Sequence, residues 1–199
     1  MSFGVNLSNT YFALRHGRST ANESGIIVSD PDNGIPEYGL SETGWVETRE
    51  RLQPGNMPRH FSDEDTICFS SDFRRAMETA EVFCDQNGLG LYLLSSHLRE
   101  RSFGELELDS HERYQEIWDQ DDLSDSHNHL GSESPAQVRG RLTAFMDEIE
   151  GRFSSTNIIV VAHGDTLQIL QTIFAGIACN RHRSLPHLNN AELRKLNRG

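Results

Sequence analysis

Two histidines, each followed by a glycine, are the residues of this sequence best suited to chemistry: His16-Gly17 and His163-Gly164. An imidazole can attack phosphorus when one ring nitrogen is unprotonated and the other donates a hydrogen bond, usually to a backbone carbonyl. The glycine that follows has no Cβ, so the backbone there can approach a ligand closely. We therefore expect the two histidines to converge on one bound anion.

Arginines accompany these histidines although the chain as a whole is acidic. The 199 residues carry 18 Lys and Arg against 30 Asp and Glu, a formal net charge of −12, which argues against a general nucleic-acid binder. Arg15 directly precedes His16, and Arg74 and Arg75 follow a predicted strand. Guanidinium groups bind phosphoryl oxygens in a bidentate manner and stay charged, so these positions favour an anion site.

A leaving alkoxide also needs a proton donor, and Glu100 in a predicted loop after a strand is the candidate. The alternative is an exposed glutamate between Arg99 and Arg101 that has no catalytic role. For Arg75 the alternative is a helix-surface residue paired with an acidic neighbour on the same helix.

The elements that must position these residues alternate between strand and helix. Residues 9–14 and 157–162 are apolar runs that end directly before the histidine motifs, and the second is continuous, as in strands buried on both faces. In open α/β sheets, ligands bind beyond the carboxyl ends of the strands. The pattern predicts a three-layer α/β/α sandwich with a mostly parallel mixed sheet, with these two strands side by side at its centre.

Periodicity and capping residues predict the remaining elements. Residues 23–38 are rich in Gly, Pro, Asp and Asn, and we expect a loop there. Residues 188–196 alternate weakly and are expected to form an edge strand. The other predicted elements are strands at 66–69 and 91–94, and helices at 41–52, from 73 to the Gly88 that ends it, 111–118, 135–149 (capped by Ser134) and 164–174.

Several segments, in the correct order along the chain, carry a resemblance to a known family. LRHGRSTAN (14–22) resembles the LRHGxSxxN signature of the histidine phosphatase superfamily, which includes the cofactor-dependent phosphoglycerate mutases. The other similar segments are LSETG (40–44), SSDFRRAMETA (70–80), LRERSFGELE (98–107), GSESPAQVRGR (131–141), VVAHGDTL (160–167) and NNAEL (189–193). Together they span nearly the whole chain, whereas RHG alone would be a weak signal.

The resemblance implies a phosphoglycerate mutase-like fold and a phosphohistidine mechanism. His16 would be the nucleophile, and Glu100 would protonate the leaving group and later act as the base for water. The implied phosphate-binding residues are Arg15, Ser19, Asn22, Arg75, His163 and Gly164, of which Arg15, Arg75 and His163 are also counted as catalytic. We expect no cofactor and no metal ion, because histidines and arginines would do the work of a divalent cation.

Three positions depart from the family pattern. Asp72 stands where the family often has Pro, a position with no chemical role. Leu108 stands where many members have Gly, which is expected to change the course of its loop. Arg18 replaces the common Glu and is expected to add a positive charge near the mouth of the pocket.

The function so inferred is hydrolysis of a phosphomonoester through a phosphohistidine on His16. The alternative is a phosphoglycerate mutase-type phosphoryl-transfer isomerase. That branch has a long insertion where only 26 residues separate Gly104 from Gly131 here, so water access and hydrolysis are favoured. A non-catalytic phospholigand-binding module would be expected to lack a catalytic residue, and none is missing.

The absence of linkers and repeats predicts one domain over 1–199, with 103–133 as an acidic lid-like insertion. That insertion holds ten Asp and Glu against the single Arg113. Its stretch 119–125 is interpreted as solvated lid surface. His127 and His129 are interpreted as a polar loop tip rather than a metal site, because no third ligand lies at a recognisable spacing.

Composition limits the remaining classes. No apolar run approaches the roughly 20 residues of a membrane span, and the N-terminus lacks the pattern of a secretory signal, so we expect a cytoplasmic protein. The three widely spaced cysteines are interpreted as buried free thiols. The expected partner is a small phosphorylated substrate, with no nucleic acid and no membrane; the sequence leaves the oligomeric state and a phosphoprotein target open.

Overall fold

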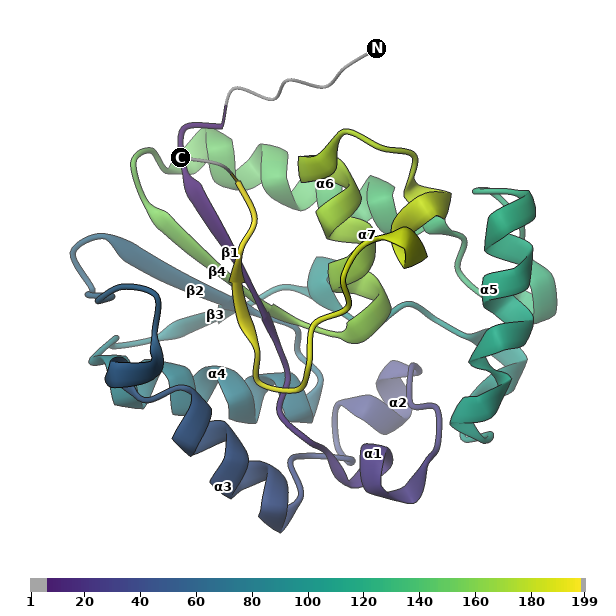
Figure 1. The fold of residues 1–199 in the computed structure, drawn as a ribbon, viewed down its shortest axis with the longest axis horizontal. Helices are drawn as coiled ribbons and strands as arrows, with labels where there is room; N and C mark the ends of the chain where they lie inside the picture. The colour runs from purple at the N-terminus through teal and green to yellow at the C-terminus, as the bar shows by residue number, and fades with distance from the viewer. Residues whose placement is uncertain (1–6, 198–199) are drawn as a thin grey trace.

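A five-stranded sheet forms the middle layer of the structure, a computed structural model that describes residues 7–197 (Figure 1). The strands lie in the order β3-β2-β4-β1-β5. Every neighbouring pair is parallel except β1 with β5, so the sheet is mixed and mostly parallel, as predicted. The strands are β1 (Thr10–Arg15), β2 (Thr66–Ser70), β3 (Tyr92–Leu94), β4 (Asn157–Ala162) and β5 (Leu193–Lys195).

Helices cover both faces of this sheet (Figure 1). On one face lie α3 (Glu42–Arg51) and α4 (Arg74–Asn87), and on the other lie α6 (Pro135–Arg152) and α7 (Gly164–Ala175). The side chains of β1 and β4 alternate between one apolar cluster shared with α6 and α7 and another shared with α4. This period-two burial produces the predicted three-layer α/β/α sandwich.

The two central strands place both histidines at one edge of the sheet. β1 and β4 pair in parallel, with Arg15 opposite Ala162. All six residues of β4 are buried, which accounts for its continuous apolar sequence. Because the two strands end in register, His16 and His163 leave the sheet as neighbours.

Short helices occupy part of the segment that the sequence predicted to be a loop (23–38). α1 (Thr20–Ser24) is capped by Ser19, and α2 (Pro31–Gly34) is capped by Asp30. With 5 and 4 residues, each makes only about one turn, which is too short to show a helical period in the sequence. The loop prediction was therefore wrong at these two turns.

The remaining elements differ from the predictions mainly in length. The expected edge strand at 188–196 is reduced to β5, because a turn precedes it in which the Glu192 N–H donates to the Asn189 carbonyl at 3.1 Å. The helix expected at 111–118 is a 3-10 turn, His111–Arg113, continued by α5 (Tyr114–Leu123). Further 3-10 helices are Pro54–Asn56, Ser96–Leu98, Gly104–Leu106, His129–Gly131 and Cys179–Ser184.

The 103–133 segment packs around a small apolar cluster that it shares with Ile27, and its helix α5 stands at one side of the molecule, apart from the sheet (Figure 1). Asp121 on α5 is 0% exposed and ion-paired with Arg101, so the prediction of a solvated surface over 119–125 was wrong at this position. The buried members of the cluster are Ile27, Phe103, Leu106 and Ile117.

Two further sequence expectations can be compared with the described part of the chain. Cys68, Cys84 and Cys179 are buried free thiols, as predicted. Between residues 7 and 197, no helix combines the length and the apolar character needed to cross a membrane.

Leu108 keeps a backbone conformation that favours glycine. Its φ is 65°, in the left-handed region, where a β-carbon costs about 1–2 kcal/mol. Its N–H nevertheless donates to the Ile27 carbonyl at 2.8 Å, and its side chain is 46% exposed. The leucine therefore leaves the turn in place, at the cost of local strain.

We predict that Leu108→Gly raises the free energy of unfolding by up to about 1 kcal/mol, because relief of strain exceeds the extra flexibility of glycine in the unfolded chain. Urea denaturation measures this change. The matched control is Gly88→Ala: Gly88 has φ +67° with no atom within 4 Å of a new Cβ. That variant should be destabilised by about 1 kcal/mol. A less stable Leu108→Gly protein would contradict the prediction.

Candidate active site

The rings of His16 and His163 lie 5.1 Å apart, centroid to centroid. Both side chains are almost fully buried, with exposures of 3% and 0%. The structure therefore brings together the two histidines that the sequence singled out, at the carboxyl ends of β1 and β4.

Hydrogen bonding fixes the tautomer of His16. Its Nδ1 lies 2.7 Å from the Gly17 carbonyl, which can only accept, so Nδ1 carries the proton and Nε2 is the unprotonated nitrogen. The Arg75 Nε–H donates to that Nε2 at 3.3 Å. Burial, and then the charges of Arg75 and Arg15, hold the pKa of His16 well below its ordinary value. His16 is therefore a neutral imidazole with its lone pair beside a guanidinium.

Arg75, in the first turn of α4, is the arginine that enters the site. It is 4% exposed, its Nη2 donates to the Val28 carbonyl at 2.9 Å, and its Nη1 is buried without a partner among the described residues. Arg74 instead lies on the helix surface and forms an ion pair with Glu78 at 2.8 Å. The structure thus assigns to Arg74 the surface pairing that was the alternative for Arg75.

Arg15 reaches the same site from the end of β1. Its Nη1 contacts the Nε2 of His187 at 2.7 Å and donates to the Leu188 carbonyl at 2.8 Å. Its Nε is buried and has no hydrogen-bond partner within residues 7–197. Burial, and then Arg15 and Arg183, lower the pKa of His187 to about 4. Sequence reasoning missed His187, which has no motif of its own around it.

Ser71 orients His163. The Ser71 Oγ accepts from the Phe73 N–H at 3.2 Å and lies 2.9 Å from His163 Nε2. If the hydroxyl proton goes to Nε2, the other ring nitrogen carries a proton. That nitrogen, Nδ1, is buried without a partner in the described chain. Burial, followed by Arg75 and His16, keeps the pKa of His163 well below its ordinary value.

Glu100 lies partly buried beside the start of α7. Its Oε1 accepts from the Arg101 N–H at 2.9 Å, and it contacts the Thr166 backbone nitrogen at 3.3 Å and hydroxyl at 3.1 Å. Burial and the nearby Asp165 charge raise the pKa of Glu100, against the lowering effect of these hydrogen bonds and Arg75. Glu100 is therefore not the exposed glutamate considered as the alternative.

A cavity of about 580 Å³ connects these groups. Arg15, His16, Arg75 and Glu100 line it, and the His163 ring, which is not among the lining residues, packs against that of His16. Aromatic rings form the opposite side, where Tyr114 and Trp118 of α5 stack with centroids 5.3 Å apart. The cavity therefore combines a cationic, imidazole-bearing floor with an aromatic wall supplied by the 103–133 segment.

Ser19 and Asn22 also line the cavity, but their side chains form the capping box of α1. The Ser19 Oγ donates to Asn22 Oδ1 at 3.1 Å and caps the helix, so this hydroxyl is already committed. Gly164 lines the cavity too, and a Cβ there would meet His187 at 3.1 Å. A Cβ at Gly17 would instead lie 2.0 Å from Thr48, so close packing, not ligand approach, explains that glycine.

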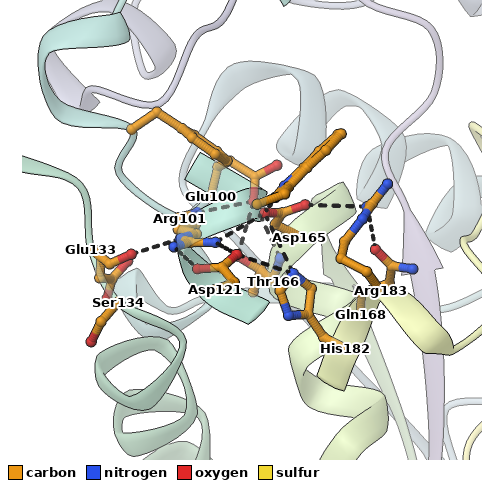
Figure 2. Close-up of polar contacts among 12 residues, drawn as sticks. Glu100, Arg101, Asp121, Glu133, Ser134, Asp165, Thr166, Gln168, His182 and Arg183 are labelled. Atoms are coloured by element: carbon orange, nitrogen blue, oxygen red, sulfur yellow. Dashed lines mark hydrogen bonds and ion pairs between the residues drawn. The ribbon is translucent and has the colours of Figure 1, made fainter. Parts of the chain in front are cut away.

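A buried ionic cluster lies beside the cavity, and sequence reasoning missed it (Figure 2). The Arg101 guanidinium donates to both carboxylate oxygens of Asp121 at 2.7 Å and approaches Asp165 at 3.4 Å. His127 also contacts Asp121 at 2.6 Å, so it belongs to this cluster and the loop-tip interpretation was wrong for it. Within residues 7–197, no set of three or more His, Cys, Asp or Glu side chains is arranged to hold a metal ion.

The family departures at Asp72 and Arg18 have different outcomes. Asp72 is outside the cavity lining but forms a bidentate ion pair with Arg99, with its closest contact at 2.6 Å. It therefore anchors the residue that precedes Glu100. Arg18 is exposed and does not line the cavity, contrary to the expectation of a charge at its mouth.

Comparison with known sequences gives consistent matches. The model of the histidine phosphatase superfamily (branch 1) matches residues 11–199. The putative phosphoserine phosphatase 2 of Hydrogenobacter thermophilus is 28% identical over 195 residues, covering 93% of this chain and 87% of that protein. A probable phosphatase of Schizosaccharomyces pombe is 26% identical over 170 residues, covering 82% of this chain and 72% of that protein.

Solved structures share the fold at lower identity. A mycobacterial glucosyl-3-phosphoglycerate phosphatase is similar with a TM-score of 0.72 and 22% identity, over 92% of this chain and 90% of that chain. YhfR of Bacillus stearothermophilus is similar with a TM-score of 0.70 and 23% identity, over 93% and 89% of the two chains. With the family match across almost the whole chain, the protein belongs to the histidine phosphatase superfamily, branch 1, and is a phosphoric monoester hydrolase.

Proposed function

We propose that the enzyme hydrolyses its substrate through a covalent phosphohistidine on Nε2 of His16. One arrangement carries the proposal: an unprotonated imidazole nitrogen with unpartnered, buried nitrogen atoms around it. Within residues 7–197 these are Arg15 Nε, Arg75 Nη1 and His163 Nδ1. Buried donors without partners are rare and costly, so their convergence supports a site for phosphoryl oxygens.

In the first half-reaction, the lone pair of His16 Nε2 attacks phosphorus as the bond to the leaving oxygen breaks. The protonated Glu100 carboxyl gives its proton to that oxygen, so an alcohol leaves and a phosphohistidine remains. Arg15, Arg75 and His163 bind the phosphoryl oxygens, whose negative charge they neutralise as the transition state forms. The first turn of α7, beginning at Gly164, adds backbone N–H groups and the positive end of the helix dipole.

In the second half-reaction, the Glu100 carboxylate accepts a proton from water while the water oxygen attacks phosphorus. The P–N bond breaks, its electron pair returns to His16 Nε2, and inorganic phosphate leaves. Glu100 is then protonated again and ready for the next cycle. Asn22 Nδ2 is the group at the start of α1 that can reach a phosphoryl oxygen, because Ser19 is committed to the helix cap.

The proposed substrate is a small phosphomonoester. The cavity has about 580 Å³, and its aromatic wall and Arg183 lie where the leaving group would project. The 103–133 segment, which supplies that wall, acts as the lid of the site within a single domain. Because one relative carries the name phosphoserine phosphatase, O-phosphoserine is the first compound to test in a phosphate-release screen. A mutase assay run alongside distinguishes hydrolysis from isomerisation.

The nucleophile can be identified directly. Rapid acid-free quenching of the wild-type enzyme with radiolabelled substrate should trap a phosphoenzyme that is stable in base and labile in acid, as a phosphoramidate is. His16→Ala should trap none and should lose turnover of both alkyl and aryl phosphates. Label on any other residue of the wild-type enzyme would contradict the mechanism.

The proton donor can be separated from the nucleophile by the choice of leaving group. General acid catalysis is typically worth about 10²–10⁴-fold, so Glu100→Gln should lose roughly that much activity on alkyl phosphates. It should retain a larger share on p-nitrophenyl phosphate, whose leaving group needs little protonation. Equal losses on the two substrates, measured as kcat/KM, would remove Glu100 from this role.

Metal dependence can be tested with a chelator. The charge of the phosphoryl group is met by Arg15, Arg75 and His163 in the proposed mechanism, so no divalent cation is required. Phosphate release should be unchanged after incubation with EDTA and after gel filtration into metal-free buffer. Loss of activity that added Mg²⁺ or Zn²⁺ restores would point to a metallohydrolase instead.

A further inference from the structure

The buried ionic cluster beside the cavity is built around Asp165, the second residue of α7. Its Oδ2 lies 3.4 Å from Arg101 Nη1 and accepts from the Trp118 indole N–H at 2.9 Å. Its Oδ1 lies 3.7 Å from Arg183, on the other side (Figure 2). Asp165 is 5% exposed and lines the cavity, so this carboxylate is held in place from several elements at once.

The surroundings of Asp165 favour its ionised form. Burial raises the pKa of this carboxyl, but His182, Arg101 and Arg183, with the indole hydrogen bond, outweigh burial and lower it. Its place in the first turn of α7 adds the favourable field of a helix N-terminus. Asp165 is therefore a fixed negative charge in the wall of the site.

This charge lies next to the proposed acid along the backbone of α7. The Glu100 carboxyl accepts from the backbone N–H of Thr166, the residue after Asp165. It also accepts from the backbone N–H of Arg101, whose guanidinium faces Asp165. Asp165 and Thr166 are consecutive, so the two carboxyl groups lie near one another at the start of α7, and both cannot be ionised without mutual repulsion; the one with ion-pair partners keeps the charge. Within the described residues, Asp165 forms ion pairs with Arg101, His182 and Arg183, whereas Glu100 forms none.

We infer that Asp165 is a positioning residue that favours the protonated form of Glu100 and, through Trp118, ties this function to the lid helix α5. The inference rests on the proposed function only in taking Glu100 as the general acid. When a substrate binds in the cavity beside α5, Glu100 would already carry the proton that the leaving group needs. The Asp165 carboxylate thus holds Trp118 in the aromatic wall and favours the protonated state of Glu100.

The charged and titratable groups around both carboxyls come from every neighbouring element. Those facing Glu100 are Asp165 of α7, Arg75 of α4, Tyr114 of α5 and Arg15 of β1. Those facing Asp165 are Arg101, Asp121 of α5, and His182, Arg183 and His187 from the segment after α7. Among them, Asp165 is the group whose charge favours a proton on Glu100; the pKa of Tyr114 is itself raised by burial, so Tyr114 stays neutral.

The decisive experiment titrates Glu100 itself in the full chain. The enzyme is labelled with ¹³C at the glutamate carboxyls, and the Glu100 resonance is assigned by its loss in Glu100→Gln. In Asp165→Asn the Glu100 midpoint should move to lower pH, because the negative charge that favours its proton is gone. In Arg183→Gln it should move to higher pH, because a positive charge is removed from the same wall. Arg183 is exposed enough that this second variant is expected to fold.

Trp118→Phe is the matched control. It removes the indole donor but keeps an aromatic ring and the Asp165 charge, so the Glu100 midpoint should stay and KM should rise. A midpoint unchanged in Asp165→Asn, or shifted in the same direction by both Asp165→Asn and Arg183→Gln, would overturn the inference and leave the proposed function intact. An equal shift in Trp118→Phe would also overturn it, since geometry rather than charge would then be responsible.

Activity provides the second readout. On O-phosphoserine or another alkyl phosphate that the screen identifies, Asp165→Asn should lose about tenfold in kcat at neutral pH, part of what a general acid supplies. The alkaline limb of its pH profile should move to lower pH, while p-nitrophenyl phosphate turnover changes much less. A selective loss in Asp165→Asn with none in Glu100→Gln would make Asp165 the acid and overturn its positioning role. A Glu100 midpoint that shifts without any leaving-group effect would instead count against the proposed function.

Discussion

The site depends on placing buried positive charge against an imidazole that must stay neutral. Arg15 and Arg75 form no ion pair with any carboxylate in residues 7–197, whereas Arg101, which does not line the cavity, is paired with Asp121. Burying an unpaired charge is expensive, and removing one partner of a buried pair costs about 3–5 kcal/mol. The Arg101 guanidinium, which supports the structure, is therefore neutralised by an ion pair, whereas Arg15 and Arg75, which face His16, are not. Those two also keep the imidazole from taking up a proton before an anion arrives.

The sequence predicts the part of this arrangement that local pattern controls. Continuous apolar runs followed by His-Gly specify two central strands and the edge at which they end, which is why His16 and His163 could be placed together. The pairing of Asp121 with Arg101 could not be predicted, because it joins the lid helix to a loop 20 residues away in a segment whose acidic composition suggests solvent. The short helices α1 and α2 could not be predicted for a different reason: a single helical turn is too short to show a helical period in the sequence. Local signals thus locate the two histidines at the ends of β1 and β4, while the contacts of the residues around them are set by packing between distant segments.

Arg75 shows how far the support of one side chain of the site extends. Its guanidinium is held by the Val28 carbonyl, in a loop that has no secondary structure to fix it. Glu107 fixes that loop instead: its Oε2 accepts from the backbone N–H and hydroxyl of Ser29, at 2.7 and 2.8 Å, and from the N–H of Asp30 at 3.0 Å. A carboxylate that accepts several N–H and O–H donors is strongly anchored. The turn at Leu108 follows directly, so its left-handed backbone is the geometry that brings Glu107 under the loop.

The loop that carries Glu100 is likewise held by contacts from the ends of two strands, β2 and β4. After β2, Asp72 forms an ion pair with Arg99, the residue before Glu100. After β4, the Thr166 hydroxyl donates to the Arg99 carbonyl at 2.8 Å. Asp72 therefore has a structural role: it anchors Arg99 from a position that is not catalytic. Because Ser71 and His163 directly follow β2 and β4, the same two strand ends set the positions of the second imidazole and of the Glu100 carboxyl.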